Sequence, residues 1–288
     1  MDLKGKTAFI TGGASGIGLA MAEAFGRAGM SVMLGDIDEA ALKAAVEKLE
    51  GLQVKADGLV CDVTERAALE AAANRTVETF GKVHVVCNNA GVGAGGPLGE
   101  VAAADWDWVV SVNLMGVVYG VESFLPRIRA HGEGGAFVNT ASMAGMLSPP
   151  GMEPYSATKF AVVAMSEGWA AQLAPENIGV SVLCPGFVKT RIDQSGRARQ
   201  ARFGGPKTLA PVAADSPVQT GIDPARVGER VREALEAGER YIFTHPDMRP
   251  MLEARFAGIL AGFDQAAASP ALAGMDYSTP QNIGMLDL

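Results

Sequence analysis

Short apolar runs alternate with longer amphipathic stretches along most of the chain. The apolar runs predict seven strands, at residues 7–10, 31–34, 59–63, 83–87, 136–139, 180–183 and 241–244. Apolar positions at helical spacing predict helices at residues 19–28, 39–49, 66–80, 104–129, 152–173, 224–237 and 248–262. Because a helix between consecutive strands is a crossover connection, this alternation predicts a parallel sheet and an α/β fold.

Composition indicates one soluble globular domain. Of the 288 residues, 48% are hydrophobic and 19% are charged. The net charge of −8 and the pI near 5.0 argue against a nucleic-acid or membrane partner. The cysteines Cys61, Cys87 and Cys184 lie far apart, which predicts buried free thiols in a reducing compartment. With only a three-residue apolar run near the N-terminus and no stretch as long as a membrane span, the protein is expected to be cytoplasmic.

A glycine-rich turn, TGGASGIG at residues 11–18, follows the first predicted strand and precedes a helix. This is the layout of a phosphate-binding unit, in which glycines let the backbone approach a pyrophosphate and the helix directs free N–H groups at its charge. A purely structural turn is the alternative. The next strand ends at Asp36, where a dinucleotide fold places a carboxylate that binds the adenosine ribose. The bland alternative is that Asp36 only caps the helix at residues 39–49, a role with which ribose binding is compatible.

Polar residues also follow the fourth and fifth strands. In the segment NNAG, residues 88–91, the small Ala90 and Gly91 would let a flat cofactor lie against the strand end, unless the segment is only a turn. Asn113 stands in an apolar helix and must find partners there, because an unsatisfied buried amide costs about 1–3 kcal/mol. Ser142 comes directly after the fifth strand, where it either binds a substrate oxygen or caps the next turn.

The central chemical feature is the pair Tyr155 and Lys159. On a helix, their spacing places a phenol and an ammonium group on one face, one turn apart. A neighbouring cation favours the ionised phenol, and lowering a tyrosine pKa from about 10 to about 7 takes roughly 4 kcal/mol. Such a pair also arises by chance, so the surrounding motifs decide its meaning.

Taken in order, these motifs resemble the short-chain dehydrogenase/reductase superfamily. The resemblance covers about residues 4–245 and rests on TGGASGIG, Asp36, Asp62-Val63, NNAG, Asn113, Ser142, Tyr155-x-x-x-Lys159 and Pro185-Gly186. It implies a single doubly wound Rossmann domain with a seven-stranded parallel sheet and helices on both faces. It places this domain at residues 1–245. Two stretches depart from a minimal family member: residues 187–223, whose loss of periodicity predicts a substrate lid within the domain, and a C-terminal helical extension and tail at 246–288.

The resemblance implies reversible hydride transfer between a nicotinamide and an alcohol or carbonyl group. Tyr155 would act as the general base, Lys159 would lower its pKa and hold the nicotinamide ribose, and Ser142 would orient the substrate oxygen. Asn113 would hold a water that links Lys159 to solvent. The expected cofactor-binding residues are Gly12, Ser15, Gly16, Ile17 and Gly18 at the pyrophosphate, Asp36 at the adenosine ribose, Asp62 and Val63 at the adenine, and Asn89, Ala90, Gly91, Tyr155, Lys159, Pro185, Gly186, Val188 and Thr190 along the rest of the dinucleotide.

NAD is favoured over NADP, because Asp36 would repel a 2′-phosphate and no basic residue follows it closely. A basic group from elsewhere in the fold would reverse this preference. No metal site is expected, since His84, His131 and His245 are not spaced as ligands. By the same resemblance, the helices at 104–129 and 152–173 would pair across a two-fold axis in a homodimer or homotetramer.

A less specific resemblance, carried by VNTASMAG, RIDQSGRARQARF and YIFTHPDMRPMLEARF, is to bacterial members that act on bulky aryl secondary alcohols and ketones. Five apolar residues would form the pocket wall for such a substrate, or would pack in the core: Met143, Met146, Leu147, Met152 and Phe187. Two other functions stay open. One is an extended-type sugar-nucleotide epimerase or dehydratase, and the other is a catalytically silent NAD-binding sensor.

Overall fold

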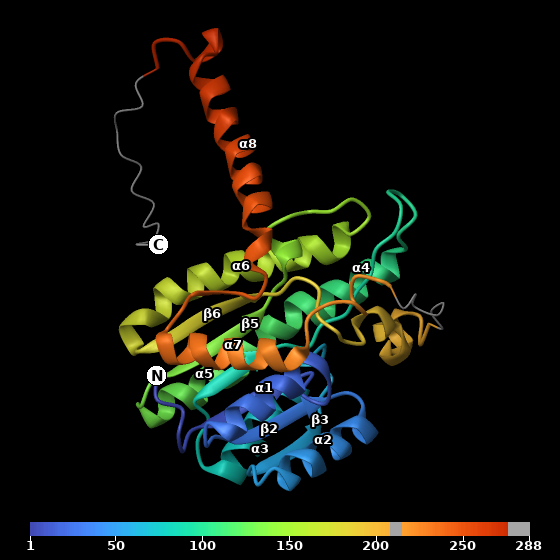
Figure 1. Ribbon diagram of the computed structural model, residues 1–288, viewed down its shortest axis with the longest axis vertical. Coiled ribbons are helices and arrows are strands. Elements are labelled where there is room, and N and C mark those ends of the chain that lie inside the picture. The colour runs from blue at the N-terminus through green and yellow to red at the C-terminus, as the bar shows by residue number, and fades with distance from the viewer. Residues whose placement is uncertain (208–214, 276–288) are drawn as a thin grey trace. The chain divides into compact units, whose positions relative to one another are not determined.

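The computed structural model describes residues 1–207 and 215–275, and over these ranges seven parallel strands form one sheet in the order β3-β2-β1-β4-β5-β6-β7 (Figure 1). The strands are β1 (Thr7–Thr11), β2 (Ser31–Asp36), β3 (Ala56–Val60), β4 (Val85–Asn88), β5 (Gly135–Thr140), β6 (Ile178–Cys184) and β7 (Tyr241–Phe243). The helices are α1 (Gly16–Arg27), α2 (Glu39–Gly51), α3 (Arg66–Phe80), α4 (Ala103–Val110), α5 (Gly116–His131), α6 (Glu153–Leu173), α7 (Pro224–Ala237) and α8 (Arg249–Ala267). The predicted α/β fold with a seven-stranded parallel sheet is confirmed.

Helices cover both faces of the sheet, and each face has its own apolar cluster. On one face α1, α2 and α7 bury residues such as Phe25, Leu49 and Val231. On the other, α3, α4, α5 and α6 bury residues such as Leu69 and Phe124. Since a central parallel strand is covered from both sides, it reads as a continuous apolar run, and every residue of β1 is buried.

The strand order reverses beside β1, which has β2 on one side and β4 on the other. In open α/β sheets, ligands bind outside the carboxyl ends of the strands at such a reversal. The glycine turn and the NNAG segment follow β1 and β4 and therefore meet in this crevice.

Two predicted elements differ from the structure. The third strand is Ala56–Val60 rather than 59–63. It lies at the edge of the sheet, and its half-exposed residues Asp57 and Gly58 do not give the apolar run by which a strand is predicted. The predicted helix at 104–129 is divided into α4 and α5 by one π-helical turn, Ser111–Met115. Such turns interrupt regular helices frequently at functional sites, and this one carries Asn113.

One helical stretch, Ala103–His131, is long and apolar enough to span a membrane, contrary to the expectation that no stretch has this length. Its most apolar window is 56% buried. Phe124 and Ile128 within it are fully buried in the cluster beneath the sheet. The apolar character of this stretch is therefore explained by core packing.

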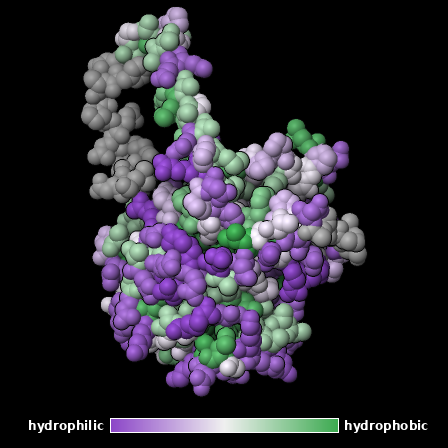
Figure 2. Space-filling model, viewed as in Figure 1, coloured by the Kyte–Doolittle hydropathy of each residue, from purple (hydrophilic) through white to green (hydrophobic). Residues whose placement is uncertain are grey.

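By internal contacts, the chain divides into the units Met1–Thr244 and His245–Leu288. Hydrophilic residues dominate the visible face of the first unit, whereas apolar residues show along α8 in the second (Figure 2). No residue of α8 is buried, and Phe256, Leu260 and Phe263 are all exposed. Residues 208–214 of the predicted lid and 276–288 of the predicted tail lie outside the described residues.

Candidate active site

In the glycine turn after β1, the backbone at Gly18 lies very close to the backbone at Gly12. Gly12 has a φ of 62°, which favours glycine, and a Cβ on Gly18 would lie 2.1 Å from the carbonyl oxygen of Gly12. Ser15 is the N-cap of α1, but its side chain makes no capping hydrogen bond, and no acidic residue stands in the first turn. The first N–H groups of α1 have no partner within the helix and are available to an anion.

Asp36, at the end of β2, faces this turn. Its Oδ2 accepts a hydrogen bond from the Ala14 N–H at 3.0 Å, and its Oδ1 accepts one from the Asp38 N–H at 3.1 Å. The cap of α2 is Asp38, whose Oδ1 accepts from the Ala41 N–H at 3.0 Å. The capping alternative for Asp36 is therefore wrong. Its half-buried carboxylate keeps further acceptor positions beside the glycine turn.

Thr11 joins the ends of β1 and β4. Its Oγ1 accepts hydrogen bonds from the N–H groups of Asn89 at 2.9 Å and Ala90 at 3.0 Å, and the Asn89 Nδ2 donates to the Thr11 carbonyl at 3.0 Å. These bonds fix the segment where the cofactor is expected. Thr11 was missed as a positioning residue, although its place directly before the glycine turn was a usable signal.

Asn113 is fully buried and has the partners that its apolar setting required. Its Oδ1 accepts from the Val92 N–H at 2.8 Å, and its Nδ2 donates to the Val92 carbonyl at 2.9 Å. A Cβ on Gly91 would lie 3.5 Å from both the Asn113 Oδ1 and the Lys159 Nζ. The two side chains therefore reach the same small space beside Gly91.

Ser142 and Tyr155 meet beyond the end of β5. The Ser142 Oγ accepts a hydrogen bond from the Ala144 N–H at 3.0 Å, so it does cap the following turn, and it donates to the Pro185 carbonyl at 3.4 Å. The Ser142 hydroxyl also interacts with the phenol of Tyr155, in the direction that lowers the tyrosine pKa. Capping and substrate orientation were weighed as alternatives, but the geometry makes them compatible.

Lys159 lies one turn after Tyr155 on α6 and is almost completely buried. Its Nζ donates to the Thr140 carbonyl at 2.8 Å and lies 5.5 Å from the centre of the Tyr155 ring. Thr140, the last residue of β5, thus accepts a hydrogen bond from the Lys159 ammonium, and Ser142 follows it two residues later. Strand β5 and helix α6 together hold three of the four expected catalytic residues at one edge of the sheet.

The acid–base properties of the pair differ from the expectation. Burial raises the pKa of Tyr155 above its ordinary value, and the interaction with Ser142 only partly opposes this. Burial lowers the pKa of Lys159 from 10.5 to about 8. The raised pKa of Tyr155 contradicts the expected lowering of the tyrosine pKa, because the loss of hydration on burial outweighs the opposing interaction with Ser142.

The segment after β6 folds back over the cofactor crevice. Val188 is buried and pairs with Ile222, which closes the base of the segment. A Cβ on Gly16 would lie 3.1 Å from the Thr190 Cγ2, so Thr190 stands against the glycine turn. Further along, the Ser195 Oγ accepts a hydrogen bond from the Gly93 N–H at 3.1 Å.

The same segment reaches the predicted adenine residues. Gln200 donates from Nε2 to both oxygens of Asp62, each at 2.9 Å, and Val63 is buried in the apolar cluster. Nothing in the sequence signalled the contact with Gln200, since 138 positions separate the two residues. Pro185 accepts bonds from two neighbours, the Met143 N–H and the Ser142 hydroxyl, and Gly186 follows it at the turn into the segment.

Two of the five predicted pocket-wall residues are exposed near the start of this segment and of α6. Phe187 is 51% exposed and Met152 is 38% exposed. By contrast, Met143 and Met146 are buried, which fits core packing for these two. Of the five residues, Phe187 and Met152 therefore expose the most apolar surface.

Two other groupings lie away from this site. His84, His131 and Glu133 have potential metal-ligand atoms within 4.8 Å of one another. Both nitrogens of each ring are hydrogen-bonded within the protein: His84 to the Thr7 N–H and to Glu133, and His131 to the Val83 carbonyl and the Glu133 N–H. A metal ion would have to displace these bonds, so the cluster is explained as a structural link at the amino-terminal ends of β1, β4 and β5.

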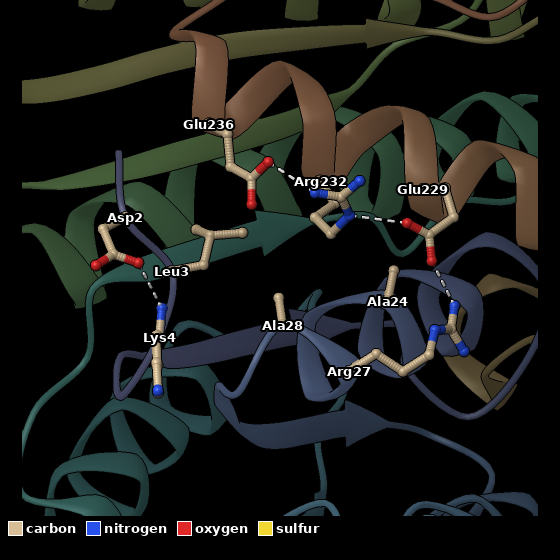
Figure 3. Close-up of a pocket in the computed structure, with 9 residues that line it drawn as sticks. All are labelled: Asp2, Leu3, Lys4, Ala24, Arg27, Ala28, Glu229, Arg232 and Glu236. Atoms are coloured by element: carbon tan, nitrogen blue, oxygen red, sulfur yellow. Dashed lines mark hydrogen bonds and ion pairs between the residues drawn. The ribbon is translucent and has the colours of Figure 1, made fainter.

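A pocket of about 370 Å³ lies between the N-terminal segment, α1 and α7 (Figure 3). Its guanidinium groups are paired: Arg27 with Glu229 at 2.7 Å, and Arg232 with Glu229 at 2.8 Å and Glu236 at 2.6 Å. The pocket is at the C-terminal end of α1, at the opposite edge of the sheet from Tyr155. It offers no unpaired guanidinium to a ligand.

A nicotinamide dinucleotide fits the residues at the carboxyl edge. The glycine turn leaves a cradle that a Cβ at Gly18 would fill, the first turn of α1 offers free N–H groups, and Asp36 presents carboxylate lone pairs beside it. Across β4, the buried Lys159 and Asn113 border Gly91. These features lie in the order that a dinucleotide requires, from adenosine to nicotinamide.

Comparison with known proteins agrees with this geometry. A family model for the short chain dehydrogenase family matches residues 6–201. A C alpha-dehydrogenase of Sphingobium sp. strain SYK-6 is 35% identical over 267 residues, which is 90% of this chain and 87% of that protein. A 3beta-hydroxysteroid dehydrogenase 2 of Eggerthella lenta is 35% identical over 227 residues, covering 74% of this chain and 87% of that protein.

Among solved structures, a short chain dehydrogenase/reductase from Burkholderia phymatum in complex with NAD is similar to this chain, with a TM-score of 0.86 and 38% identity. The match covers 91% of this chain and 96% of that one. The similarity therefore includes both halves of the sheet and the segments that carry the candidate site.

Proposed function

Because this chain belongs to the short-chain dehydrogenase family, we propose that it transfers a hydride between NAD and a secondary alcohol or ketone. The observation that carries the proposal is the convergence of Tyr155, Ser142 and Lys159 at the carboxyl edge of the sheet, next to a glycine cradle that fits a dinucleotide. The family uses NAD or NADP, and the carboxylate of Asp36 beside the glycine turn favours NAD, because it would repel a 2′-phosphate.

The protein residues would handle the proton and the charge. A bound nicotinamide supplies the hydride acceptor in oxidation and the hydride donor in reduction. Neutral Tyr155 is the form that gives a proton to a carbonyl oxygen, whereas oxidation requires the ionised phenol, which the Lys159 ammonium favours. Ser142, whose hydroxyl interacts with the phenol, would orient the substrate oxygen. Asn113, held by Val92, would support a water beside Lys159.

The substrate class is proposed to be bulky and hydrophobic. Phe187 and Met152 present exposed apolar surface on the segments that flank Tyr155. Apolar side chains around a few convergent polar groups are typical of sites for small hydrophobic ligands. The names of two relatives, C alpha-dehydrogenase and 3beta-hydroxysteroid dehydrogenase 2, are those of dehydrogenases, and the second specifies a hydroxysteroid. A homodimer or homotetramer built on α4, α5 and α6 is proposed as the assembly.

The test is NADH formation by the purified protein with secondary alcohols graded by size. Tyr155→Phe should reduce kcat/KM at least a hundredfold, since general acid–base catalysis contributes about 10²–10⁴-fold. Tyr119→Phe is the matched control, because Tyr119 contacts Arg66 away from the site, and it should keep full activity.

Two results would refute the proposal. One is no NADH from any alcohol in the panel, and the other is full activity in Tyr155→Phe. An epimerase would turn over without releasing NADH, and a silent sensor would bind NAD without turnover.

A further inference from the structure

The carboxylate of Asp62 already holds several donors in this structure. Gln200 Nε2 lies 2.9 Å from both oxygens, and Oδ1 also accepts from the Thr64 N–H at 3.0 Å and the Thr64 hydroxyl at 2.6 Å. A carboxylate offers about four lone-pair positions. The Gln200 amide is the side chain from outside this turn that donates to both oxygens, and the Arg202 guanidinium lies 3.9 Å from Oδ2.

The orientation of the Gln200 amide is fixed from its other end. Its Oε1 accepts a hydrogen bond from the Trp108 Nε1–H at 3.1 Å, and Trp108 is 3% exposed. An indole N–H only donates and a carboxylate only accepts, so the amide oxygen must face Trp108 and the amide nitrogen must face Asp62. The contact is specific in direction and in residue type.

The segment that carries Gln200, residues 192–203, is anchored on both sides of it. Buried Arg199 is paired with Asp105, and its guanidinium lies 5.3 Å from the centre of the Trp108 ring. Phe203 is buried in the same apolar cluster as Trp108. Because Ser195 of this segment also binds the Gly93 N–H, the segment spans from the substrate side of the crevice to its adenine side.

We propose that Gln200 is a positioning residue that competes with the adenine of the cofactor for Asp62. The inference rests on the proposed function, which places the adenine at Asp62. The exocyclic amine of adenine is a hydrogen-bond donor, as is the Gln200 amide, and both need the same carboxylate oxygens. Binding of the dinucleotide then displaces Gln200 from Asp62 and from the Trp108 N–H, so the adenine end of the cofactor acts on the segment whose Ser195 reaches the substrate side.

Calorimetric NAD affinity of variants tests this competition. Gln200→Ala removes the competitor and should lower the Kd for NAD by about three- to tenfold, as expected for one hydrogen bond to a charged acceptor. Gln200→Lys replaces the amide with a charged donor and should raise the Kd. Neither variant should change the binding of nicotinamide mononucleotide, which lacks adenine. Gln219→Ala is the matched control, since Gln219 binds Asp193 instead.

Fluorescence gives a second readout, because the Trp108 N–H loses its acceptor when Gln200 moves. AMP should shift the emission of the native protein but not that of Gln200→Ala, and Trp108→Phe assigns the signal among the three tryptophans. An unchanged or higher Kd for NAD in Gln200→Ala, or no emission shift with AMP, would overturn the inference alone. If neither protein binds NAD, the proposed function fails as well.

Discussion

Replacing Lys159 by methionine should abolish activity and yet stabilise the protein at neutral pH. Burial lowers the pKa of Lys159 from 10.5 to about 8. At 1.36 kcal/mol per pKa unit, keeping this side chain protonated in the fold costs about 3 kcal/mol. Methionine has a similar length and removes this cost, but it leaves the Thr140 carbonyl without its donor, a loss of about 1–2 kcal/mol. The variant should therefore be more stable by about 1–2 kcal/mol at pH 7.

The pH dependence of this difference identifies its origin. The folded chain binds fewer protons than the unfolded chain between pH 8 and 10.5, so the destabilisation by Lys159 is complete below pH 8 and is relieved as the pH rises towards 10.5. At pH 9.5 the cost falls to about 1.5 kcal/mol, and the advantage of the variant should vanish. Lys43→Met is the matched control, because Lys43 is exposed on α2 and should show no such trend.

The assay is urea unfolding of the three proteins at pH 7 and pH 9.5, followed by circular dichroism, with m-values compared to confirm similar unfolding. A Lys159→Met variant that is less stable than the native protein at pH 7 would refute the reasoning. So would a stability difference that does not change between the two pH values, since the destabilisation would then not come from the buried charge.

Three further predictions concern the glycine turn with Asp36, where the cofactor is expected, and His84, which directly precedes β4. Asp36→Ala should reduce the ratio of kcat/KM with NAD to kcat/KM with NADP by about tenfold or more, because the variant loses a hydrogen bond to the NAD ribose and the repulsion of the NADP 2′-phosphate. An unchanged ratio would contradict this prediction. Gly18→Ala should weaken NAD binding at least tenfold by calorimetry, because its Cβ would lie 2.1 Å from the Gly12 carbonyl oxygen; native affinity would show that the turn does not hold the pyrophosphate. Burial lowers the pKa of His84 below 6.5 despite its bond to Glu133, so the free energy of unfolding should fall as the pH drops through 6.5. In urea unfolding, the native protein should therefore lose part of its stability advantage over His84→Gln between pH 7 and pH 5.

The sequence by itself determined the order of elements, the parallel sheet and the order of the site motifs. Apolar runs and helical periodicity are local properties, and they placed six of the seven strands and the helices at Arg66–Phe80 and Pro224–Ala237. The edge strand β3 was misplaced because half of its surroundings is solvent, so its residues need not be apolar. The π-helical turn at Asn113 was missed because apolar residues continue at helical spacing through it, so the pattern does not distinguish it from a regular α-helix.

Only the tertiary structure decided how the site residues interact. The pKa directions of Tyr155 and Lys159 depend on burial, which neither the spacing of the pair nor its charge reveals. The assignment of the α2 cap to Asp38, and so the availability of Asp36, required the observed hydrogen bonds. The contact between Gln200 and Asp62 joins residues 138 positions apart. Such contacts depend on how the chain packs over long separations, whereas strands, helices and turns are set by neighbouring residues, and this physical difference separates what the sequence predicted from what it could not.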